Sequence, residues 1–368
     1  MPEIAINPRL RKSPFFDATV KAGVTEFTVY NHMLMPTSYG DPAGEYWRLI
    51  NGVSLWDVAA ERQVEFSGPD AARLAQYLTP RNLSTCRIGR GKYVPLCNHQ
   101  GHLLNDPVLL RIDEDRYWLS LADSDVRLWV QAVIAEGGFV VEAHEPDVSP
   151  LALQGPGAEA VIIDLFGEWV KELKYFWFRE ANLNGIPLVV ARSGWSKQGG
   201  FELYLRDGSR GTELWDIVWE AGRPSDIGPG TPNGIERVES ALLSYGTDTE
   251  PDTNPFEVGL RRYVDLEQEA EFIGKAALEA IAAEGPRHHQ LGLFIEEGAP
   301  IVPNQHKWPV QVEGYTVGNV TAAVYSPRLE QNIALALVES RVSAGGEAVT
   351  VLTPDGPRQA ETTTLPFC

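Results

Sequence analysis

The chain has 368 residues, 43% of them hydrophobic and 22% charged, which is enough for two or three domains that each bury a core. Its formal net charge of -19 excludes nucleic acid and anionic membranes as partners, because both need a basic surface. Three cysteines without a CxxC pair, an N-terminus without a signal core and no apolar run of ~18 residues predict a cytoplasmic protein.

Two apolar stretches in the first third of the chain carry carboxylates. In "GVSLWDVAAERQVEF", Trp56 is either core or the wall of a pocket, Asp57 is suited to capping the local turn, and Glu61 is either a surface residue or part of a site. In "GHLLNDPVLLR", Asp106 interrupts an apolar run, which costs free energy unless the carboxylate is paired or functional. The alternative is that Asp106 caps the turn before Pro107.

Two strand–turn–helix patterns each occur twice, about 85 residues apart. The segment "VEFSGPDAARLAQYL" (64–78) has the order of "LALQGPGAEAVIIDLF" (151–166). Likewise, "YWLSLADSDVRLWVQAVIAEGG" (117–138) has the order of "FELYLRDGSRGTELWDIVWEAG" (201–222). A repeat of this length predicts a duplicated α+β unit, with chance similarity of two strand–helix units as the alternative.

The segment "SGWSKQGGFELYL" (193–205) places a Trp, a Lys and two adjacent glycines directly before a strand. Period-two alternation puts Glu202 and Tyr204 on one face of that strand and Phe201 and Leu203 on the other. A carboxylate beside a phenol, entered through a Gly-Gly loop, predicts a site for a polar or cationic small molecule. A solvated strand face is the alternative.

Arg237 lies in "NGIERVESALLSYGTDTEPDTNPFEVGL", beside the apolar face of a helix expected to start near Asn233. It is either a surface charge or a bidentate partner for a ligand carboxylate. The polar, proline-rich loop that follows is too long to be a simple turn and indicates a functional segment.

After about residue 285 the pattern changes to short alternating runs separated by Gly, Pro and Asn turns, from "HHQLGLFIEEG" to "EAVTVLT". Such runs predict an all-β C-terminal domain, either a sandwich or a small barrel. The segment "GPRHH" (285–289) is suited to link it to the preceding helix.

The motifs of several enzyme classes are missing. The sequence has no GxxxxGK[ST] phosphate loop, no strand-borne GxGxxG, no HExxH and no GxSxG. His99 and His102 lack the further nearby ligands that zinc requires, so no metal is expected. An enzyme of this sequence is expected to use a bound organic cofactor or to position two substrates.

Seven segments occur in the order found in the glycine cleavage T-protein (aminomethyltransferase) superfamily, which the chain resembles from about residue 25 to its end. They are "GVSLWDVAAERQVEFSGPDA", "GKYVPLCNHQGHLLNDPVLLR", "LALQGPGA", "SGWSKQGGFELYL", "RVESALLSYGTDTEPDTNPFEVGL", "FIGKAAL" and "VGNVTAAVYSP". Within the superfamily, "YNHMLMP", "WDVAAERQV", "YWLSLADSD", "ARSGWSKQGGFE" and the terminal "LPF" most resemble the dimethylsulfoniopropionate demethylase branch.

The resemblance implies an α+β fold of three domains around a central opening that binds tetrahydrofolate. The first lobe is then expected at 1–50 and 146–284, the second, related lobe at 51–145, and a β-barrel-like domain at 285–368. Tetrahydrofolate is expected as methyl acceptor, without a metal. A small-molecule methyl donor is the second partner, and a homodimer is one option for the assembly.

The resemblance also assigns residues. Asp106 matches the family's catalytic or folate-positioning Asp, and Tyr93 in "GKYVP" matches a tyrosine that lines the folate site. Glu202 matches the Glu that hydrogen-bonds the pterin ring, and Arg237 matches an Arg near the folate. Trp195 stands where T-proteins usually have a Tyr.

The donor side departs from the T-protein pattern. The run Trp195-Ser-Lys-Gln replaces roughly Gly-Tyr-Thr-Gly-Glu, and Glu61 replaces a Met, which argues against aminomethyl-lipoyl chemistry. Aromatic faces and Lys197 suit a methylated sulfonium with a carboxylate tail. The residues expected to bind the donor are Tyr30, Trp56, Glu61, Trp195, Lys197 and Tyr204.

The implied activity is transfer of a methyl group from dimethylsulfoniopropionate to tetrahydrofolate, giving methylmercaptopropionate and 5-methyltetrahydrofolate. One alternative keeps the mechanism but uses glycine betaine, dimethylglycine or an aryl methyl ether as donor. Another is the aminomethyltransferase of the glycine cleavage system, which needs a lipoyl-carrying partner. A folate-binding module without turnover is the alternative outside the enzymes.

Overall fold

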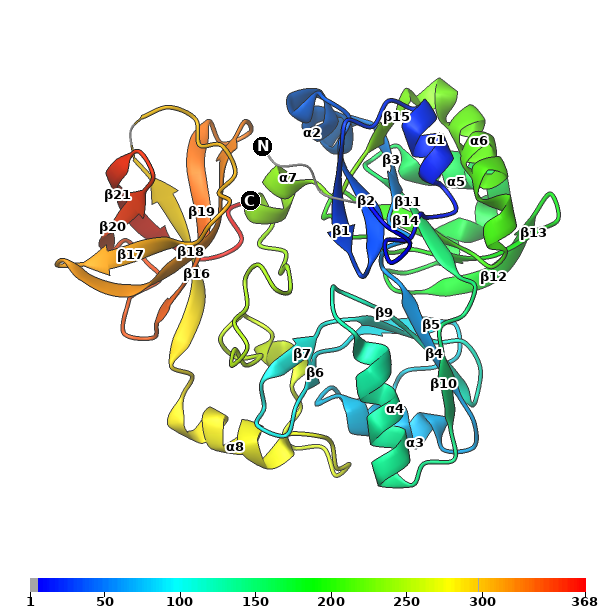
Figure 1. Cartoon of the computed structure of the whole chain (residues 1–368), viewed down its shortest axis with the longest axis horizontal. Helices are drawn as coiled ribbons and strands as arrows, with labels where there is room; N and C mark the ends of the chain where they lie inside the picture. The colour runs from blue at the N-terminus through cyan, green and yellow to red at the C-terminus, as the bar shows by residue number, and fades with distance from the viewer. Residues whose placement is uncertain (1–5, 297) are drawn as a thin grey trace. The chain divides into compact units, whose positions relative to one another are not determined.

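A computed structural model describes residues 6–296 and 298–368 and divides the chain into two compact units (Figure 1). The first unit contains the residues through Leu74, Thr85–Tyr93 and Pro107–Asn233. The second contains Ala75–Ser84, Val94–Asp106 and Gly234–Cys368. The fold is mixed α+β, as expected.

The larger sheet of the first unit has six strands. In spatial order they are β12 (Phe178–Leu183), β13 (Ile186–Ala191), β14 (Gly200–Leu205), β11 (Ser149–Gln154), β3 (Val53–Asp57) and β15 (Ile227–Gly230). Neighbours are antiparallel except β15 and β3, which run parallel. Apolar side chains of α1 (Phe16–Lys21), α5 (Ala158–Phe166) and α6 (Gly211–Gly222) pack with one face of this sheet in a common core.

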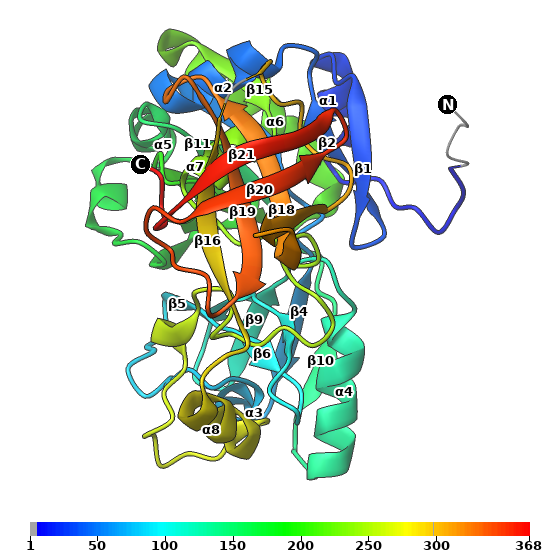
Figure 2. The ribbon, with the colours of Figure 1, turned by 90° about the vertical axis from the view of Figure 1, so that its left-hand side faces the viewer.

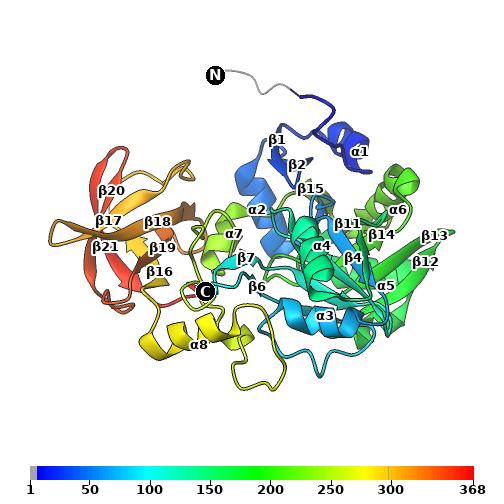
Figure 3. The same cartoon turned by 60° about the horizontal axis from the view of Figure 1, so that its bottom comes forward.

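The second sheet of this unit has five antiparallel strands. Their order is β10 (Glu142–His144), β4 (Gln63–Ser67), β9 (Arg116–Ser120), β8 (Val108–Arg111) and β5 (Arg90–Tyr93). Helix α4 (Val126–Gly137) lies alongside it (Figure 3). Helix α2 (Pro42–Asn51) and the hairpin of β1 (Glu26–Tyr30) and β2 (Met33–Ser38) precede β3.

The predicted repeat is confirmed at the level of strand pairing. Strand β4 leads through a turn to α3 (Ala71–Leu78) as β11 leads to α5, and β9 leads to α4 as β14 leads to α6. In each sheet the two repeated strands are antiparallel neighbours, β4 with β9 and β11 with β14. The equivalent turns also share a steric need for glycine. A Cβ on Gly68 (φ +143°) would lie 2.5 Å from the Val140 carbonyl oxygen, and one on Gly155 (φ +112°) 2.4 Å from that of Gly52.

The C-terminal part is a closed six-stranded barrel, so the barrel alternative is confirmed over the sandwich. Its order is β16 (His288–Ile295), β19 (Gln331–Glu339), β18 (Tyr315–Ser326), β17 (Trp308–Val312), β20 (Ala348–Thr353) and β21 (Gly356–Thr363). In Figure 2 the barrel strands are toward the viewer, and β20 and β21 are red. The second unit also contains α7 (Gly234–Glu239), α8 (Lys275–Glu284) and the pair β6 (Leu96–Cys97) and β7 (Leu103–Asn105).

Strand β3 lies in a different sheet from the one expected for the lobe at 51–145. The second lobe was expected to begin at residue 51, but β3 pairs with β11 and β15 in the six-stranded sheet. All five of its residues are buried, and its apolar run therefore completes the core of the first lobe. The remainder of the three-domain division stays a prediction.

Asp57, at the end of β3, caps its local turn as expected, because its side chain accepts a hydrogen bond from the Ala59 amide at 3.2 Å. The Ser13 hydroxyl donates to its other oxygen. Burial raises the pKa of Asp57 to about 6, and both hydrogen bonds only partly oppose this. The charged form is therefore disfavoured in the folded protein.

Asp57→Asn is expected to change how stability depends on pH. A carboxyl whose pKa is 3.8 unfolded and about 6 folded stabilises the folded state only while it is protonated. That stability, about 3 kcal/mol, is lost as the pH rises from 3.8 through 6. Denaturant unfolding from pH 4 to 7 should show this loss in the parent protein and in the exposed control Asp164→Asn, but not in Asp57→Asn. If the free energy of unfolding depended on pH equally in all three proteins, the prediction would be wrong.

Candidate functional site

Strand β14 confirms the alternation predicted for 201–205. Phe201, Leu203 and Leu205 lie in the apolar core shared with α5 and α6. Glu202 and Tyr204 lie on the opposite face, yet they are only 4% and 1% exposed. The solvated-face alternative is therefore wrong, and a carboxyl and a phenol are buried together.

Glu202 receives two hydrogen bonds on one oxygen. The hydroxyls of Ser193 and Tyr204 both donate to its Oε2, the latter at 2.9 Å. Burial raises the pKa of Glu202, and the two hydrogen bonds lower it by less. Glu202 thus keeps its proton to higher pH than an exposed carboxyl.

The loop before β14 is held by Gln154, a fully buried residue that sequence reasoning missed. Its side chain donates to the Ser193 carbonyl at 3.1 Å and accepts from the Ser196 hydroxyl at 2.7 Å. A Cβ on Gly194 would lie 2.0 Å from the Gln154 amide nitrogen, and one on Gly200 would lie 2.3 Å from the Leu153 carbonyl oxygen. The glycines of this segment therefore allow the loop to close on β11. A Gln ending the apolar run "LALQ" was the available signal.

Glu61 belongs to the same polar group. Burial and then the charges of Glu202 and Glu61 raise the pKa of Tyr204, and the Ser120 side chain nearby partly opposes the shift. The Ser120 hydroxyl also donates to Glu61 Oε2 at 3.5 Å, and Gln63 Nε2 donates to Ser120 Oγ at 3.1 Å. Glu61, Tyr204 and Glu202 are thus brought together, through a serine that sequence reasoning missed.

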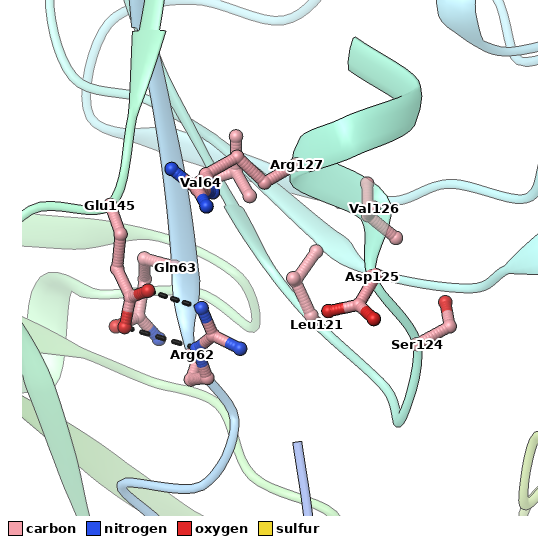
Figure 4. A pocket seen from close by; sticks show the side chains of 9 residues that line it. All are labelled: Arg62, Gln63, Val64, Leu121, Ser124, Asp125, Val126, Arg127 and Glu145. Carbon is pink, nitrogen blue, oxygen red and sulfur yellow. Dashed lines mark hydrogen bonds and ion pairs between the residues drawn. The ribbon is translucent and has the colours of Figure 1, made fainter. Parts of the chain in front are cut away.

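Figure 4 shows how the chain next to Glu61 is anchored. The Arg62 guanidinium bonds Glu145, which also accepts from Arg11 Nη1 at 2.7 Å. Burial alone would raise the pKa of Glu145, but the bonds from Arg62 and Arg11 lower it overall. The hollow drawn here, about 10 Å³, has room for no more than one water molecule. The Arg62–Glu145 ion pair therefore holds the start of β4 in place, and the hollow beside it is too small to bind a substrate.

Two other residues expected to bind the donor lie in or against apolar cores of the first unit. Trp56 is 1% exposed and packs with Leu49, and its indole nitrogen donates to Ser54 Oγ at 2.7 Å. This position supports the interpretation of Trp56 as a core residue. Trp56 and Glu202 nevertheless lie on the same face of the sheet, because Ala152 pairs with both of them. Tyr30 packs against the core of the six-stranded sheet.

Asp106 lies in the second unit, directly after β7, and is 8% exposed. Burial and then the charge of Asp106 raise the pKa of Tyr245. The phenol of Tyr245 therefore feels the field of this carboxylate. Tyr245 comes from the loop that the sequence indicated as functional, but it was not itself predicted.

Arg237 is not a surface charge, because it is 6% exposed on α7. Its Nη1 and Nη2 lie 2.7 and 3.3 Å from the carboxylate oxygens of Asp248. Asp248 is fully buried and also accepts from Thr321 Oγ1 at 2.7 Å and the Ser244 amide at 2.8 Å. The expected bidentate carboxylate is thus found within the chain, and a contact of Arg237 with folate stays a prediction.

Residues 6–296 and 298–368 contain neither a candidate membrane span nor a candidate metal cluster. No helix there is long and apolar enough to cross a bilayer. The same residues contain no group of three or more His, Cys, Asp or Glu side chains placed to hold a metal ion.

Comparisons with known proteins identify the family. The model of the GCVT N-terminal domain matches residues 15–268, and that of the glycine cleavage T-protein C-terminal barrel domain matches residues 289–368. The chain belongs to the glycine cleavage T-protein family. It is therefore a folate-dependent transferase of methyl or other one-carbon groups.

Relatives in this family cover almost the whole chain. The dimethylsulfoniopropionate demethylase of Ruegeria pomeroyi is 42% identical over 97% of both chains. An aminomethyltransferase of Desulfitobacterium hafniense is 30% identical over 93% of this chain and 94% of its own. The crystal structure of the glycine cleavage system aminomethyltransferase T from Bartonella henselae aligns over 98% of both chains with a TM-score of 0.87 at 24% identity. The T-protein fold predicted from the sequence is confirmed.

The other residues assigned through the T-protein family occupy distinct environments. Tyr93 ends β5, is half-buried and pairs with Val108 of β8. Trp195 is half-buried in the loop that Gln154 holds, and Lys197 is exposed in the same loop. Their roles toward folate and donor stay predictions.

Proposed function

We propose that this chain moves a methyl group from dimethylsulfoniopropionate to tetrahydrofolate, giving methylmercaptopropionate and 5-methyltetrahydrofolate. The observation that carries the proposal is the 42% identity to the Ruegeria pomeroyi demethylase over 97% of both chains. The first aminomethyltransferases it matches reach 29–32%. The departures at Glu61, Trp195 and Lys197 support the same choice.

The reaction needs positioning more than acid–base power. The sulfonium methyl carbon is electrophilic, and the N5 lone pair attacks it while the carbon–sulfur bond breaks. The bonding electrons leave with sulfur as a neutral thioether, and N5 gives up its proton. Holding N5 in line with the methyl carbon is the main contribution of the protein, and near-attack geometry of this kind supplies several kcal/mol.

The Glu202 group suits the pterin. A buried carboxyl with hydroxyl donors on one oxygen offers a fixed, directional partner for the ring's N–H groups. Asp106, whose charge helps to raise the pKa of Tyr245, is assigned to orient N5 or accept its proton. These assignments give the two carboxyl groups different tasks.

The donor is assigned to the loop before β14 and the residues beside it. A sulfonium cation gains roughly 0.5–2 kcal/mol from each aromatic face it contacts. The half-buried Trp195 is assigned to supply such a face, whereas Tyr204 is 1% exposed and donates its hydroxyl to Glu202. The exposed ammonium of Lys197 suits the donor's carboxylate. Glycine betaine carries the same two charges, so the donor must be tested directly.

The test is a reaction of the purified protein with tetrahydrofolate and one donor at a time. Dimethylsulfoniopropionate, glycine betaine and dimethylglycine are compared, and 5-methyltetrahydrofolate and the demethylated product are quantified by mass spectrometry. Equal amounts of both products from the sulfonium alone are expected. Turnover of another donor, or activity only with a lipoyl-carrying protein, would overturn the proposal while leaving the family assignment intact.

A further inference from the structure

We propose that Asn31 is a positioning residue for the methyl donor, because its hydrogen bonds hold Tyr30 and Glu61 in place relative to each other. Both of these residues are expected from the sequence to bind the donor. The inference therefore rests on the proposed function. It gives a role to an asparagine that the sequence analysis did not single out.

Asn31 is the first residue of a two-residue turn. Strand β1 ends at Tyr30 and β2 begins at Met33, so Asn31 and His32 alone connect the two strands. Their φ angles are +49° and +61°, the left-handed conformation that a type I′ turn has at both positions. Asparagine adopts this conformation more readily than most residues. The turn thus places Asn31 directly after Tyr30 in a backbone conformation that suits it.

Hydrogen bonds connect Asn31 to the segment that carries Glu61. The Asn31 Nδ2 donates to the Ala60 carbonyl oxygen at 3.0 Å, and the Asn31 carbonyl oxygen accepts from Arg62 Nη1 at 3.4 Å. The residues on both sides of Glu61 are therefore bonded to Asn31. Arg62 is itself held by its ion pair with Glu145.

A second loop is bonded to the same asparagine. The Asn31 Nδ2 also donates to the Ala122 carbonyl oxygen at 3.2 Å, and the Asn31 backbone amide donates to Asp123 Oδ1 at 2.7 Å. Both acceptors follow Ser120, whose hydroxyl donates to Glu61 at 3.5 Å. Asn31 thus holds the turn against two loops, one that contains Glu61 and one that follows a hydrogen-bond partner of Glu61.

Another asparagine of the first unit shows that such a turn does not require a buried side chain. Asn184, between β12 and β13, is also the first residue of a two-residue turn and has a φ angle of +51°. Its side chain is exposed, whereas Asn31 is 3% exposed. Burial of an amide is unfavourable unless the amide is hydrogen-bonded. The bonds of Asn31 therefore join separate segments, in addition to any role of this residue in the turn.

The expected consequence concerns the donor and not the folate. A donor that contacts both Tyr30 and Glu61 binds best when the spacing between them is fixed before it arrives. Removal of the Asn31 side chain would break its bonds to both loops and let that spacing vary. Glu202, which is assigned to the pterin, is held by two hydroxyl groups that Asn31 does not contact.

The test compares Asn31→Gly with Asn184→Gly in steady-state assays of the full chain, with the donor and tetrahydrofolate varied in turn. Glycine accepts the left-handed conformation at both positions, and the first substitution also removes two hydrogen bonds to other loops. Asn31→Gly should lower kcat/KM for the donor about tenfold or more and leave the KM for tetrahydrofolate within about twofold. Asn184→Gly should match the parent protein for both substrates.

Asp123→Ala is a second variant that keeps the side chain of Asn31. Asp123 is exposed, and its replacement removes the acceptor of the Asn31 backbone amide. It should lower kcat/KM for the donor by a smaller factor, about threefold. Denaturant unfolding verifies that each variant is folded, and Asp123→Ala decides the outcome if Asn31→Gly is not. An unchanged kcat/KM for the donor in the folded variants, or an equal rise in KM for tetrahydrofolate, would overturn the positioning role.

The parent protein separates this inference from the proposed function. Turnover of glycine betaine in place of dimethylsulfoniopropionate would overturn the proposed donor, and the same variants would then be compared with glycine betaine as substrate. Turnover of dimethylsulfoniopropionate with equal constants in the parent protein and the variants would overturn the role of Asn31 alone. Absence of turnover with every donor would overturn both proposals.

Discussion

Replacing Asp106 by asparagine should lower kcat for methyl transfer about 10²–10⁴-fold, the usual contribution of a positioned acid–base group. Asparagine keeps the size and the hydrogen-bonding capacity of the side chain but removes its charge and its ability to take a proton. Asp106 is 8% exposed, so water is a poor substitute for the lost oxygen. Steady-state assays with the donor and tetrahydrofolate varied in turn measure the effect.

The pattern of the kinetic constants is as informative as the size of the loss. A fall in kcat with little change in the KM for tetrahydrofolate assigns Asp106 to the transition state. A raised KM with unchanged kcat would reassign it to ground-state folate binding. The exposed Glu279→Gln on α8 is the control for loss of a negative charge in the same unit and should retain parent activity.

Replacing Arg237 by alanine should destabilise the second unit by about 3–5 kcal/mol, the cost of removing one member of a buried ion pair. The side chains of Arg237 and Asp248 are 7% and 0% exposed, so Asp248 would keep a buried charge with only Thr321 and the Ser244 amide to bond it. Hydrogen exchange of α7 and β18 reports this local stability without assuming that the two units unfold together.

Two further variants separate the ion pair from simple loss of side-chain volume. Arg237→Met combined with Asp248→Leu removes both charges and should recover part of the lost stability. Arg341→Ala breaks an exposed pair with Glu339 in the same unit, and such pairs contribute at most about 1 kcal/mol. Equal effects of Arg237→Ala and Arg341→Ala would contradict the argument.

Local patterns in the sequence predicted a substantial part of the structure. Period-two alternation placed Glu202 and Tyr204 on one face of β14. The repeated strand–turn–helix order predicted a duplicated α+β unit, and the structure has two sheets in which the repeated strands pair in the same way. The alternating runs after residue 285 predicted an all-β domain, either a sandwich or a small barrel, and the structure has the barrel. In each case the signal lies within one element or in consecutive elements, where side-chain period is fixed by backbone geometry.

Those local patterns did not predict which residues far apart in the sequence would contact each other. Arg237 resembled a surface residue because its partner Asp248 lies 11 residues later in an irregular loop. Ser120 and Gln154 are ordinary polar residues until the fold buries them beside Tyr204 and the 193–199 loop. Burial within apolar strands was their available signal, the same one that singled out Asp106.

The position of β3 also determines the order in which the nascent chain can fold. Its sheet partners β11 and β15 lie beyond the whole of the five-stranded sheet in sequence, ending at Gly230. At about 5–20 residues per second, a ribosome needs on the order of ten seconds or more to make the intervening chain. All strands of the five-stranded sheet are complete before β11 is made, so that inserted sheet is expected to form first. Through this interval β3 is an unpaired apolar strand, which makes it the segment where we expect chaperone binding during translation.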